Sequence, residues 1–294
     1  MRKKVIIKQT LALLIFLVLL FHLYVFQFAY TLFQEPRVTE PLNLPHSFIP
    51  LQVHQLVPEQ NYYTLKAILK SFDKNPRVQH RIWTDEQMDT FVAQNYPNLY
   101  SIYTSLDPFI LKADLARYMI LNVFGGIYSD SDTLLLKDVM EWVPAIFDNI
   151  TMIIGVEADD KLNPSLEKAY PRPLQFVQWT FATMAHHPIL EKAISTAVSR
   201  LNDSFVIYKD VGQRVMETTG PGLWTDVILA YLLEEYQVSK EELEGLKEAK
   251  CIGNSILILP IEAFGSQSKD PSKGLIRHLF QGSWKKKESS DLED

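Results

Sequence analysis

The stretch from Asp107 to Lys137, DPFILKADLARYMILNVFGGIYSDSDTLLLK, predicts a helix, a sharp turn and a strand in direct succession. Asp107 is a residue type that caps helices, and Pro108 fits a first helical turn. Apolar residues then recur at near-helical spacing, at Ile110, Ala113, Ala116, Leu121 and Phe124. The helix is expected to stop at Gly125-Gly126, and a short strand, Ile127–Tyr128, is expected to follow.

Polar side chains gather at two places in this stretch. Asp114, Arg117 and Tyr118 lie three and four residues apart, so they share one face of the predicted helix and can point at one ligand. Side chains alternate along a strand, so Asp130 and Asp132 are expected on the same side of the chain. The two carboxylates form a candidate cation site at the end of the strand.

A D-x-D pair at a strand end suits a nucleotide diphosphate. Hard divalent cations such as Mg²⁺ and Mn²⁺ take oxygen ligands, often one or two carboxylates, and leave other positions for water and phosphates. Ligands of open α/β sheets collect beyond the carboxyl ends of the strands, where this pair is expected. The alternative for the tripeptide alone is an ordinary polar turn.

The segment KADLARYMILNVFGGIYSDSDTLLL resembles the signature of the DXD-motif sugar transferases that include the fungal initiation-specific α-1,6-mannosyltransferases; clostridial glucosylating toxins share a looser form. The similarity continues in order through VHQ at 53–55, IWTDE at 82–86, IGVEAD at 154–159, QFVQWTFATMAHHPIL at 175–190, TGPGLWTDVI at 219–228 and RHLFQGSWK at 277–285. The resemblance implies an α/β fold: a GT-A-like nucleotide-sugar-binding domain with a mixed central sheet flanked by helices.

The resemblance also implies an activity and a set of site residues. It implies metal-dependent transfer of mannose from GDP-mannose to an N-glycan-type acceptor with retention, using Mn²⁺ or Mg²⁺. Asp130, Asp132 and His278 would hold the metal, although His278 packed against the last strand is the alternative. Asp114, Arg117 and Tyr118 would bind the donor. Ser283 and Trp284 would donate hydrogen bonds to its diphosphate.

The N-terminal region predicts a membrane anchor. Residues 9–33 contain no Asp, Glu, Lys or Arg, and this uncharged segment is long enough to span a membrane. Four basic residues precede it. That charge bias predicts a cytoplasmic tail at residues 1–8 and a type II topology, with the domain in a lumen or outside the cell. The family resemblance implies the Golgi membrane. Residues 34–46 are expected to form an extended stem, residues 47–287 the glycosyltransferase domain, and residues 288–294 a polar tail.

The start of the domain predicts a strand, a helix and a second strand. The run SFIPLQVHQLV gives the first strand, residues 62–71 the helix, and residues 78–83 the second strand. The ends of both strands would face the same crevice as the D-x-D pair, which makes His54 and Trp83 candidate donor-site residues. Packing in the core is the alternative for both.

Later segments supply further candidates. A strand at residues 151–156 would deliver Glu157 and Asp159 to the crevice, where carboxylates can steady an oxocarbenium-like sugar or orient an acceptor hydroxyl. A polar loop is the alternative. Residues 173–185 predict a helix with Gln178 and Trp179 as weaker candidates. Helices at 223–233 and 239–250 and a strand at 255–259 complete the expected order.

Charge and cysteine content narrow the function. Of the 29 Lys and Arg residues, four precede the anchor, which leaves 25 against 35 acidic residues and a net charge of about −10. Such a charge argues against nucleic acid as a partner. Cys251 is the single cysteine, so no disulfide forms within the chain. The sequons at Asn149 and Asn202 fit a secretory compartment.

Two alternative functions remain open. The first is a non-catalytic, membrane-anchored subunit that binds a glycan or supports other mannosyltransferases in a complex. The second is a mannosyltransferase acting on inositol phosphorylceramide. The D-x-D pair and the Arg117–Asp114 pair favour an enzyme, and the polar end KKKESSDLED favours a soluble or glycoprotein acceptor.

Overall fold

The computed structural model describes residues 42–57, 66, 68–166, 170–203, 205–264 and 274–280. They belong to a compact unit that begins at Leu42. Within these residues, no helix has the length and apolar character needed to cross a bilayer. The predicted anchor at 9–33, most of the stem, and Ser283 and Trp284 lie outside them. Residues 42–46, which the sequence assigns to the stem, already belong to this unit, because Leu44 is only 2% exposed.

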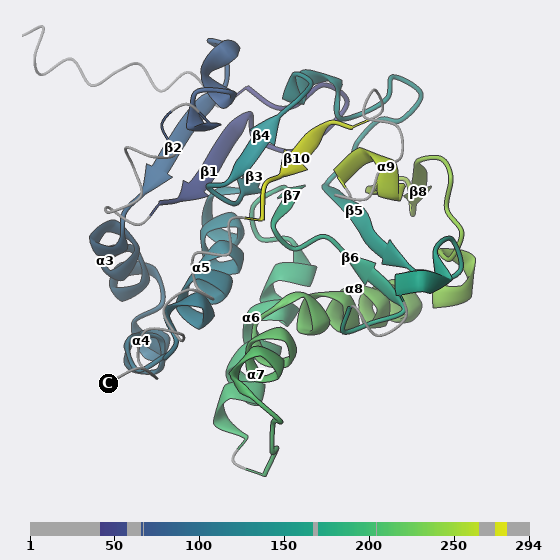
Figure 1. Ribbon diagram of the computed structural model, residues 1–294. Coiled ribbons are helices and arrows are strands. Elements are labelled where there is room, and N and C mark those ends of the chain that lie inside the picture. The colour runs from purple at the N-terminus through teal and green to yellow at the C-terminus, as the bar shows by residue number, and fades with distance from the viewer. Residues whose placement is uncertain are drawn as a thin grey trace, which may run out of the picture. The chain divides into compact units, whose positions relative to one another are not determined.

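A mixed sheet forms the centre of the unit (Figure 1). Its strands run in the order β2 (Gln79–Trp83), β1 (Gln52–Leu56), β3 (Gly126–Ser129), β7 (Thr180–Thr183), β5 (Met152–Asp159), β9 (Ile256–Leu259) and β8 (Lys250–Ile252), with β6 (Leu174–Phe176) paired to β5. β1 is parallel to β2 and β3, and β5 is parallel to β9, whereas β7 is antiparallel to both of its neighbours. The predicted α/β class with a mixed central sheet is confirmed.

Helices and loops cover both faces of this sheet. The helices are α3 (Asp85–Asn95), α4 (Tyr100–Thr104), α5 (Phe109–Phe124), α6 (Pro188–Asn202), α7 (Val211–Thr218), α8 (Pro221–Tyr236) and α9 (Ile261–Phe264). One hydrophobic cluster packs α3, α5, α6 and α8 against one face, and a second packs α9 and loop residues against the other. Ile153 and Ile154, adjacent in β5, belong to different clusters, as the alternation of a strand requires.

A small second sheet pairs β4 (Thr133–Leu135) antiparallel with β10 (Ile276–His278). β4 directly follows the D-x-D segment, and His278 pairs with Thr133 at the near end of this sheet. Two segments far apart in the sequence are therefore joined beside the candidate cation site (Figure 1).

The local predictions are confirmed in part. Strands β1, β2 and β9 and helix α8 lie close to the predicted ranges. The helix predicted at 173–185 is wrong, because this segment forms β6 and β7, whose residues are all buried. The helix predicted at 239–250 is also wrong: a short 3-10 turn, Lys240–Glu242, leads to Gly245, where φ is +79°. Most of the helix predicted at 62–71 lies outside the described residues.

Candidate active site

The turn after α5 sets the position of the D-x-D segment. The helix begins at Phe109, and Pro108 rather than Asp107 occupies the N-cap position without a side-chain cap. It ends at Phe124 as predicted, where Gly125 and Gly126 have φ of +63° and +95°. A Cβ on Gly125 would lie 2.7 Å from a backbone nitrogen, so the tight turn into β3 requires glycine.

Asp130, Ser131 and Asp132 form a turn between β3 and β4 and do not continue the strand. The expectation that strand alternation aligns the two carboxylates is therefore wrong. The carbonyl oxygen of Asp130 accepts hydrogen bonds from the Thr133 backbone N–H at 3.2 Å and from its hydroxyl at 2.6 Å. This closed turn brings the two carboxylates together.

His278 completes a three-residue cluster with Asp130 and Asp132. Their candidate ligand atoms all lie within 4.8 Å of one another. Nε2 of His278 is 3.2 Å from Oδ1 of Asp132 and 3.6 Å from Oδ2 of Asp130. Burial alone would lower the pKa of His278, but hydrogen bonds and the charges of the two carboxylates outweigh it and raise the pKa to about 9. Two carboxylates and an imidazole form a donor set that fits Mn²⁺ or Mg²⁺.

Asp130 is also held from the protein side. The Tyr128 hydroxyl donates to Oδ1 at 2.8 Å, and a guanidinium nitrogen of Arg117 lies 3.4 Å from the same oxygen. The backbone N–H of Asp130 donates to the carbonyl of Trp179 at 2.8 Å. Burial would raise the pKa of Asp130, but Arg117, His278 and the Tyr128 hydroxyl lower it below its ordinary value. The carboxylate is therefore kept charged and fixed.

The predicted polar face of α5 is confirmed as a spatial group. Arg117 pairs with Asp114 at 2.8 Å, and both side chains are almost fully buried. The Thr219 hydroxyl donates to Asp114 at 3.1 Å. Burial raises the pKa of Asp114 to about 6, although Arg117 opposes this. Nε of Arg117 is buried and has no hydrogen-bond partner among the described residues.

Tyr118 lies on the same face of α5, but its hydroxyl is hydrogen-bonded within the protein. It donates to the Thr219 carbonyl at 2.9 Å and accepts from the Gln178 side chain at 2.6 Å. Gln178 also donates to the Thr219 carbonyl at 2.7 Å. Tyr118 is fully buried. It fixes the loop before α8, and the structure shows no ligand-facing atom on it.

Glu157 and Asp159 have different surroundings. Glu157 accepts from the Trp179 indole N–H at 3.1 Å and from the Gln175 amide at 2.6 Å, and the Trp179 ring packs on His278. Burial raises the pKa of Glu157 despite these two hydrogen bonds. Asp159 instead accepts from the backbone N–H of Lys161 and, on its other oxygen, from that of Gly245. An irregularity in the β5–β6 pairing separates the two residues.

The sequence comparisons agree with this geometry. The glycosyltransferase sugar-binding region containing a DXD motif matches residues 62–147, which include the cluster turn, Asp114 and Arg117. The chain belongs to this glycosyltransferase family. It is 38% identical over 229 residues to the initiation-specific alpha-1,6-mannosyltransferase of Schizosaccharomyces pombe, and the match covers 72% of this chain and 57% of the relative.

Two further proteins are similar to this chain in sequence. The protein of the same name from Candida albicans is 31% identical over 250 residues, with 72% of this chain and 64% of the relative covered. A mannosyl phosphorylinositol ceramide synthase of Saccharomyces cerevisiae is 39% identical over 93 residues, 30% of this chain and 24% of the relative. The chain spans less than two thirds of the length of the two alpha-1,6-mannosyltransferases.

His54 and Trp83 lie in the core of this family member and away from the cluster. The Trp83 indole N–H donates to Nδ1 of His54 at 3.1 Å, and both residues are at most 2% exposed. Burial lowers the pKa of His54 to about 3, so the ring is neutral. Arg81 covers the outer side of the Trp83 ring. Of the two interpretations, core packing and donor binding, these contacts agree with core packing for both residues.

Sequence reasoning overlooked Tyr128, Gln175 and Thr219, which hold Asp130, Glu157 and Asp114 respectively. Tyr128 is two residues before Asp130 in the strand, and this spacing was the available signal. The other two contacts join distant segments, so no local pattern predicts them.

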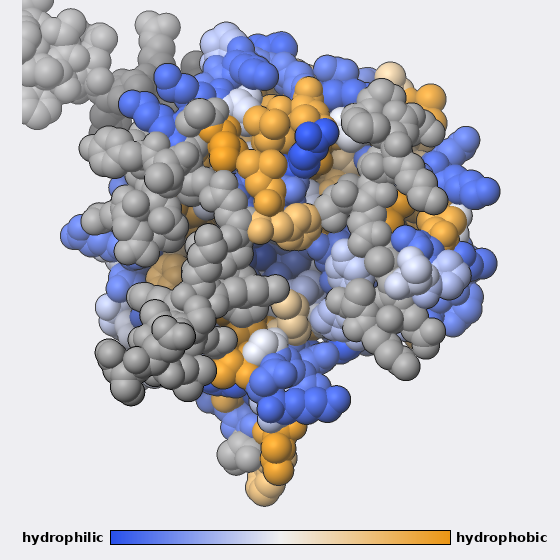
Figure 2. Space-filling model, viewed as in Figure 1, coloured by the Kyte–Doolittle hydropathy of each residue, from blue (hydrophilic) through white to orange (hydrophobic). Residues whose placement is uncertain are grey.

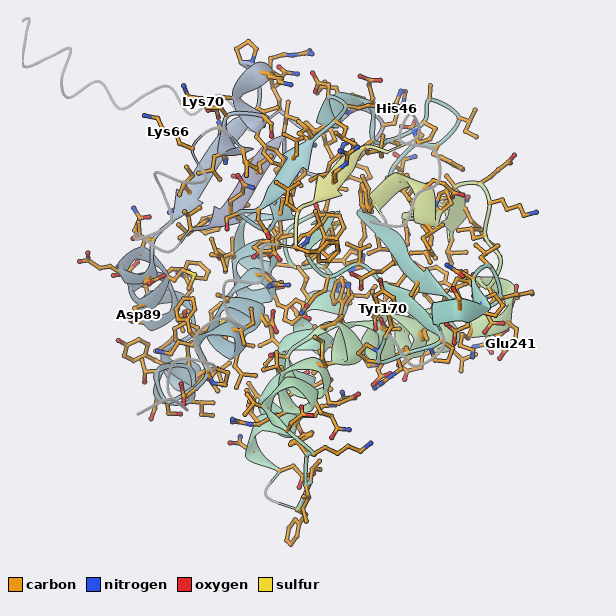
Figure 3. The ribbon with its side chains drawn as sticks, viewed as in Figure 1. His46, Lys66, Lys70, Asp89, Tyr170 and Glu241 are labelled. Atoms are coloured by element: carbon orange, nitrogen blue, oxygen red, sulfur yellow. The ribbon has the colours of Figure 1, made fainter. Side chains whose placement is uncertain are left out.

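The polar cluster differs from the ordinary charged surface. The charged side chains labelled in Figure 3, including Lys66, Asp89 and Glu241, project outward at the rim. Figure 2 shows hydrophilic surface in a recess near the centre of the same view, between the regions of α5 and β6. The recess matches the place where the ends of several strands meet in Figure 1.

Proposed function

We propose that this chain is a divalent-metal-dependent glycosyltransferase with a GT-A-type domain, which transfers mannose from GDP-mannose to an N-glycan-type acceptor through an α-1,6 linkage with retention. One observation carries the proposal: the Asp130, Asp132 and His278 cluster adjoins the buried Asp114–Arg117 pair. Transfer of mannose and the α-1,6 linkage are supported by the names of two relatives that each match 72% of the chain, whereas GDP as the nucleotide rests on the family resemblance.

The three cluster residues would hold Mn²⁺ or Mg²⁺. The fit rests on the donor set, two carboxylates and one imidazole, and on ligand atoms that already lie within 4.8 Å of one another. When bound, the cation supplies positive charge against the charge that develops on the diphosphate as the sugar–phosphate bond breaks.

The residues of the chain supply binding and orientation. Arg117 would bind a sugar or phosphate oxygen, while Asp114 would accept hydrogen bonds from sugar hydroxyls. The Tyr128 hydroxyl and Arg117 fix Asp130, so this carboxylate does not have to reorganise when the donor binds. Glu157, held by Trp179 and Gln175, would orient the acceptor hydroxyl or steady positive charge on the sugar.

A second acceptor class has a specific observation in its favour. The mannosyl phosphorylinositol ceramide synthase matches at 39% identity over 93 residues. That match is short, and an inositol phosphoceramide mannosyltransferase of Schizosaccharomyces pombe that matches 70% of the chain is only 28% identical. The alpha-1,6-mannosyltransferases match 72% of the chain at 38% and 31% identity. We therefore place the N-glycan acceptor first and the inositol phosphorylceramide acceptor second. A non-catalytic subunit would need no intact cation cluster, which makes it the third choice.

The same proposal includes a location. A single N-terminal span at residues 9–33 would hold the domain in the Golgi lumen in a type II orientation, near other mannosyltransferases with which it could form a complex. The apolar run and the basic residues before it support this assignment.

The test is turnover by the full chain of GDP-mannose, UDP-glucose and UDP-galactose, with Mn²⁺ or with a chelator. Oligomannose N-glycans and inositol phosphorylceramide serve as competing acceptors. Manganese-dependent use of GDP-mannose with the oligomannose acceptor supports the proposal, and mannosylation of the lipid alone moves the second acceptor class to first place. A folded chain that binds and turns over none of the donors overturns the enzyme assignment.

A further inference from the structure

A chain of hydrogen bonds reaches the Asp130–Asp132 turn from the sheet edge. The Gln55 side-chain amide donates to the backbone carbonyl of Asp130 at 3.0 Å. Its oxygen lies 2.8 Å from Nε2 of His80, and Nδ1 of His80 lies 2.8 Å from a carboxylate oxygen of Asp73. These residues come from β1, β2 and the 3-10 turn Phe72–Lys74, and none of them was a candidate from the sequence.

Donor and acceptor capacities assign the direction of each bond. A backbone carbonyl only accepts, so the NH₂ group of Gln55 must face Asp130 and its oxygen must face His80. That oxygen also only accepts, so Nε2 of His80 carries a proton. An ionised Asp73 accepts at Nδ1, so that nitrogen donates as well. With Nε2 donating to Gln55 and Nδ1 donating to Asp73, each hydrogen bond in the chain has a donor and an acceptor.

Burial restricts the Gln55 amide to one orientation. Gln55 is fully buried, and the His80 side chain is only 8% exposed, whereas Asp73 is 56% exposed. Leaving a buried amide unpaired is costly, so Gln55 has one favoured orientation. The Phe72 ring also packs on His80 and offers no competing charge.

The carbonyl held by Gln55 is the one that closes the turn. It also accepts from the backbone N–H and the hydroxyl of Thr133. Gln55 therefore ties β1, next to the edge strand of the sheet, to the turn. Residues that orient ligands from outside the coordination sphere commonly affect cation affinity by about 10- to 100-fold.

We propose that Gln55 is a positioning residue for the Asp130–Asp132 turn and that His80, with Asp73, fixes the orientation of its amide. The effect on cation binding rests on the proposed function, whereas the effect on the turn does not. Gln55 does not touch the ligands' carboxylates, so it acts by holding the backbone that carries them.

The experiment compares Gln55→Met with Gln52→Met in the full chain. Both glutamines lie in β1, but the Gln52 amide donates to the Phe124 carbonyl at the end of α5 and serves as the matched control. Amide hydrogen exchange is measured over residues 129–133, and Mn²⁺ affinity is measured by titration calorimetry. Gln55→Met is expected to speed exchange at the turn at least about tenfold and to weaken Mn²⁺ binding about tenfold, with Gln52→Met unchanged in both.

A second pair of variants tests the orientation of the amide. His80→Phe removes the donor to the Gln55 oxygen and should reproduce the effect of Gln55→Met on exchange. His80→Lys keeps a cationic donor and should restore slow exchange at the turn. Unchanged exchange in Gln55→Met, or no rescue by His80→Lys, overturns the inference. Faster exchange in Gln55→Met, in a chain whose wild type binds no Mn²⁺, supports the positioning role and refutes the proposed function.

Discussion

Nε2 of His278 lies 3.2 Å from Oδ1 of Asp132, across a small antiparallel sheet whose two strands are far apart in the sequence. The backbone N–H of Leu279 donates to the carbonyl of Asp132 and fixes this pairing at 2.9 Å. The negative charge of Asp130 and Asp132 is offset within the chain by Arg117, beside Asp130, and by a proton on His278, whose pKa is raised to about 9. A divalent cation would offset it in the proposed function.

Replacement of Asp132 by alanine is expected to abolish most transfer while the fold survives. A bound cation contributes several kcal/mol to the transition state, so kcat/KM should fall about 100-fold or more. The side chain lies in a partly exposed turn, so the thermal midpoint should change little. Steady-state kinetics and circular dichroism measure the two effects. Activity within about twofold of wild type would refute the metal site.

Replacement of Arg117 by lysine is expected to impair both donor binding and stability. The guanidinium contacts Asp114, Asp130 and the carbonyl of Gln178 at once, and a lysine ammonium does not reproduce that planar fork. We expect at least a tenfold loss in kcat/KM and about 2 kcal/mol lower unfolding free energy, since buried carboxylates lose partners.

The control for this change is Arg200→Lys. Arg200 pairs with Asp226 and donates to the Glu217 carbonyl, in a partly exposed network of α6, α7 and α8. It should lose stability without a change in donor KM. Equal effects of the two substitutions on KM would show that Arg117 has a structural role alone.

Local sequence signals were sufficient where the chain's own spacing determines structure. The apolar period of α5 and the Gly125-Gly126 pair predict a helix, its end and the strand β3. The same method gave a helix for 173–185, because the apolar residues of this segment also fit helical spacing and periodicity does not separate a short buried strand from a buried helix. In the structure every residue of β6 and β7 is buried between two layers.

The site was predictable where residues are neighbours in the chain and unpredictable where folding brings them together. The residues alone identify Asp130 and Asp132, but only the family resemblance pointed to His278, which reaches them across the β4–β10 pairing. The predicted strand end treated Glu157 and Asp159 alike. In the structure the β5–β6 pairing is irregular at Glu157, which packs with Trp179 beside the cluster, whereas Asp159 accepts from backbone N–H groups.

The two carboxylates of β5 should therefore respond differently to amide substitution. Glu157→Gln places an NH₂ group against one of two N–H donors, so we expect kcat to fall by about 10²-fold with Mn²⁺ affinity preserved. Asp159→Asn loses one of two backbone hydrogen bonds, so unfolding free energy should fall by about 1 kcal/mol with kcat within about twofold. Steady-state kinetics and urea unfolding of both variants test this expectation. A large loss of kcat in Asp159→Asn with little change in Glu157→Gln would assign the catalytic role to Asp159.

Acid sensitivity should originate partly at His187, the N-cap of α6. Its Nδ1 accepts from the backbone N–H of Ile189, and burial lowers its pKa to about 4. As pH falls from about 6.5, the unfolded chain binds the proton first, so stability is lost progressively down to about pH 4, by about 3 kcal/mol from this group.

His187→Asn keeps a capping acceptor and does not titrate. Urea unfolding at pH 7 and pH 4.5 should show a smaller decrease in unfolding free energy for His187→Asn than for wild type. Burial also lowers the pKa of His54, to about 3, so His54 contributes to this decrease in both proteins. Identical losses in the two proteins would mean that His187 carries its proton in the folded state.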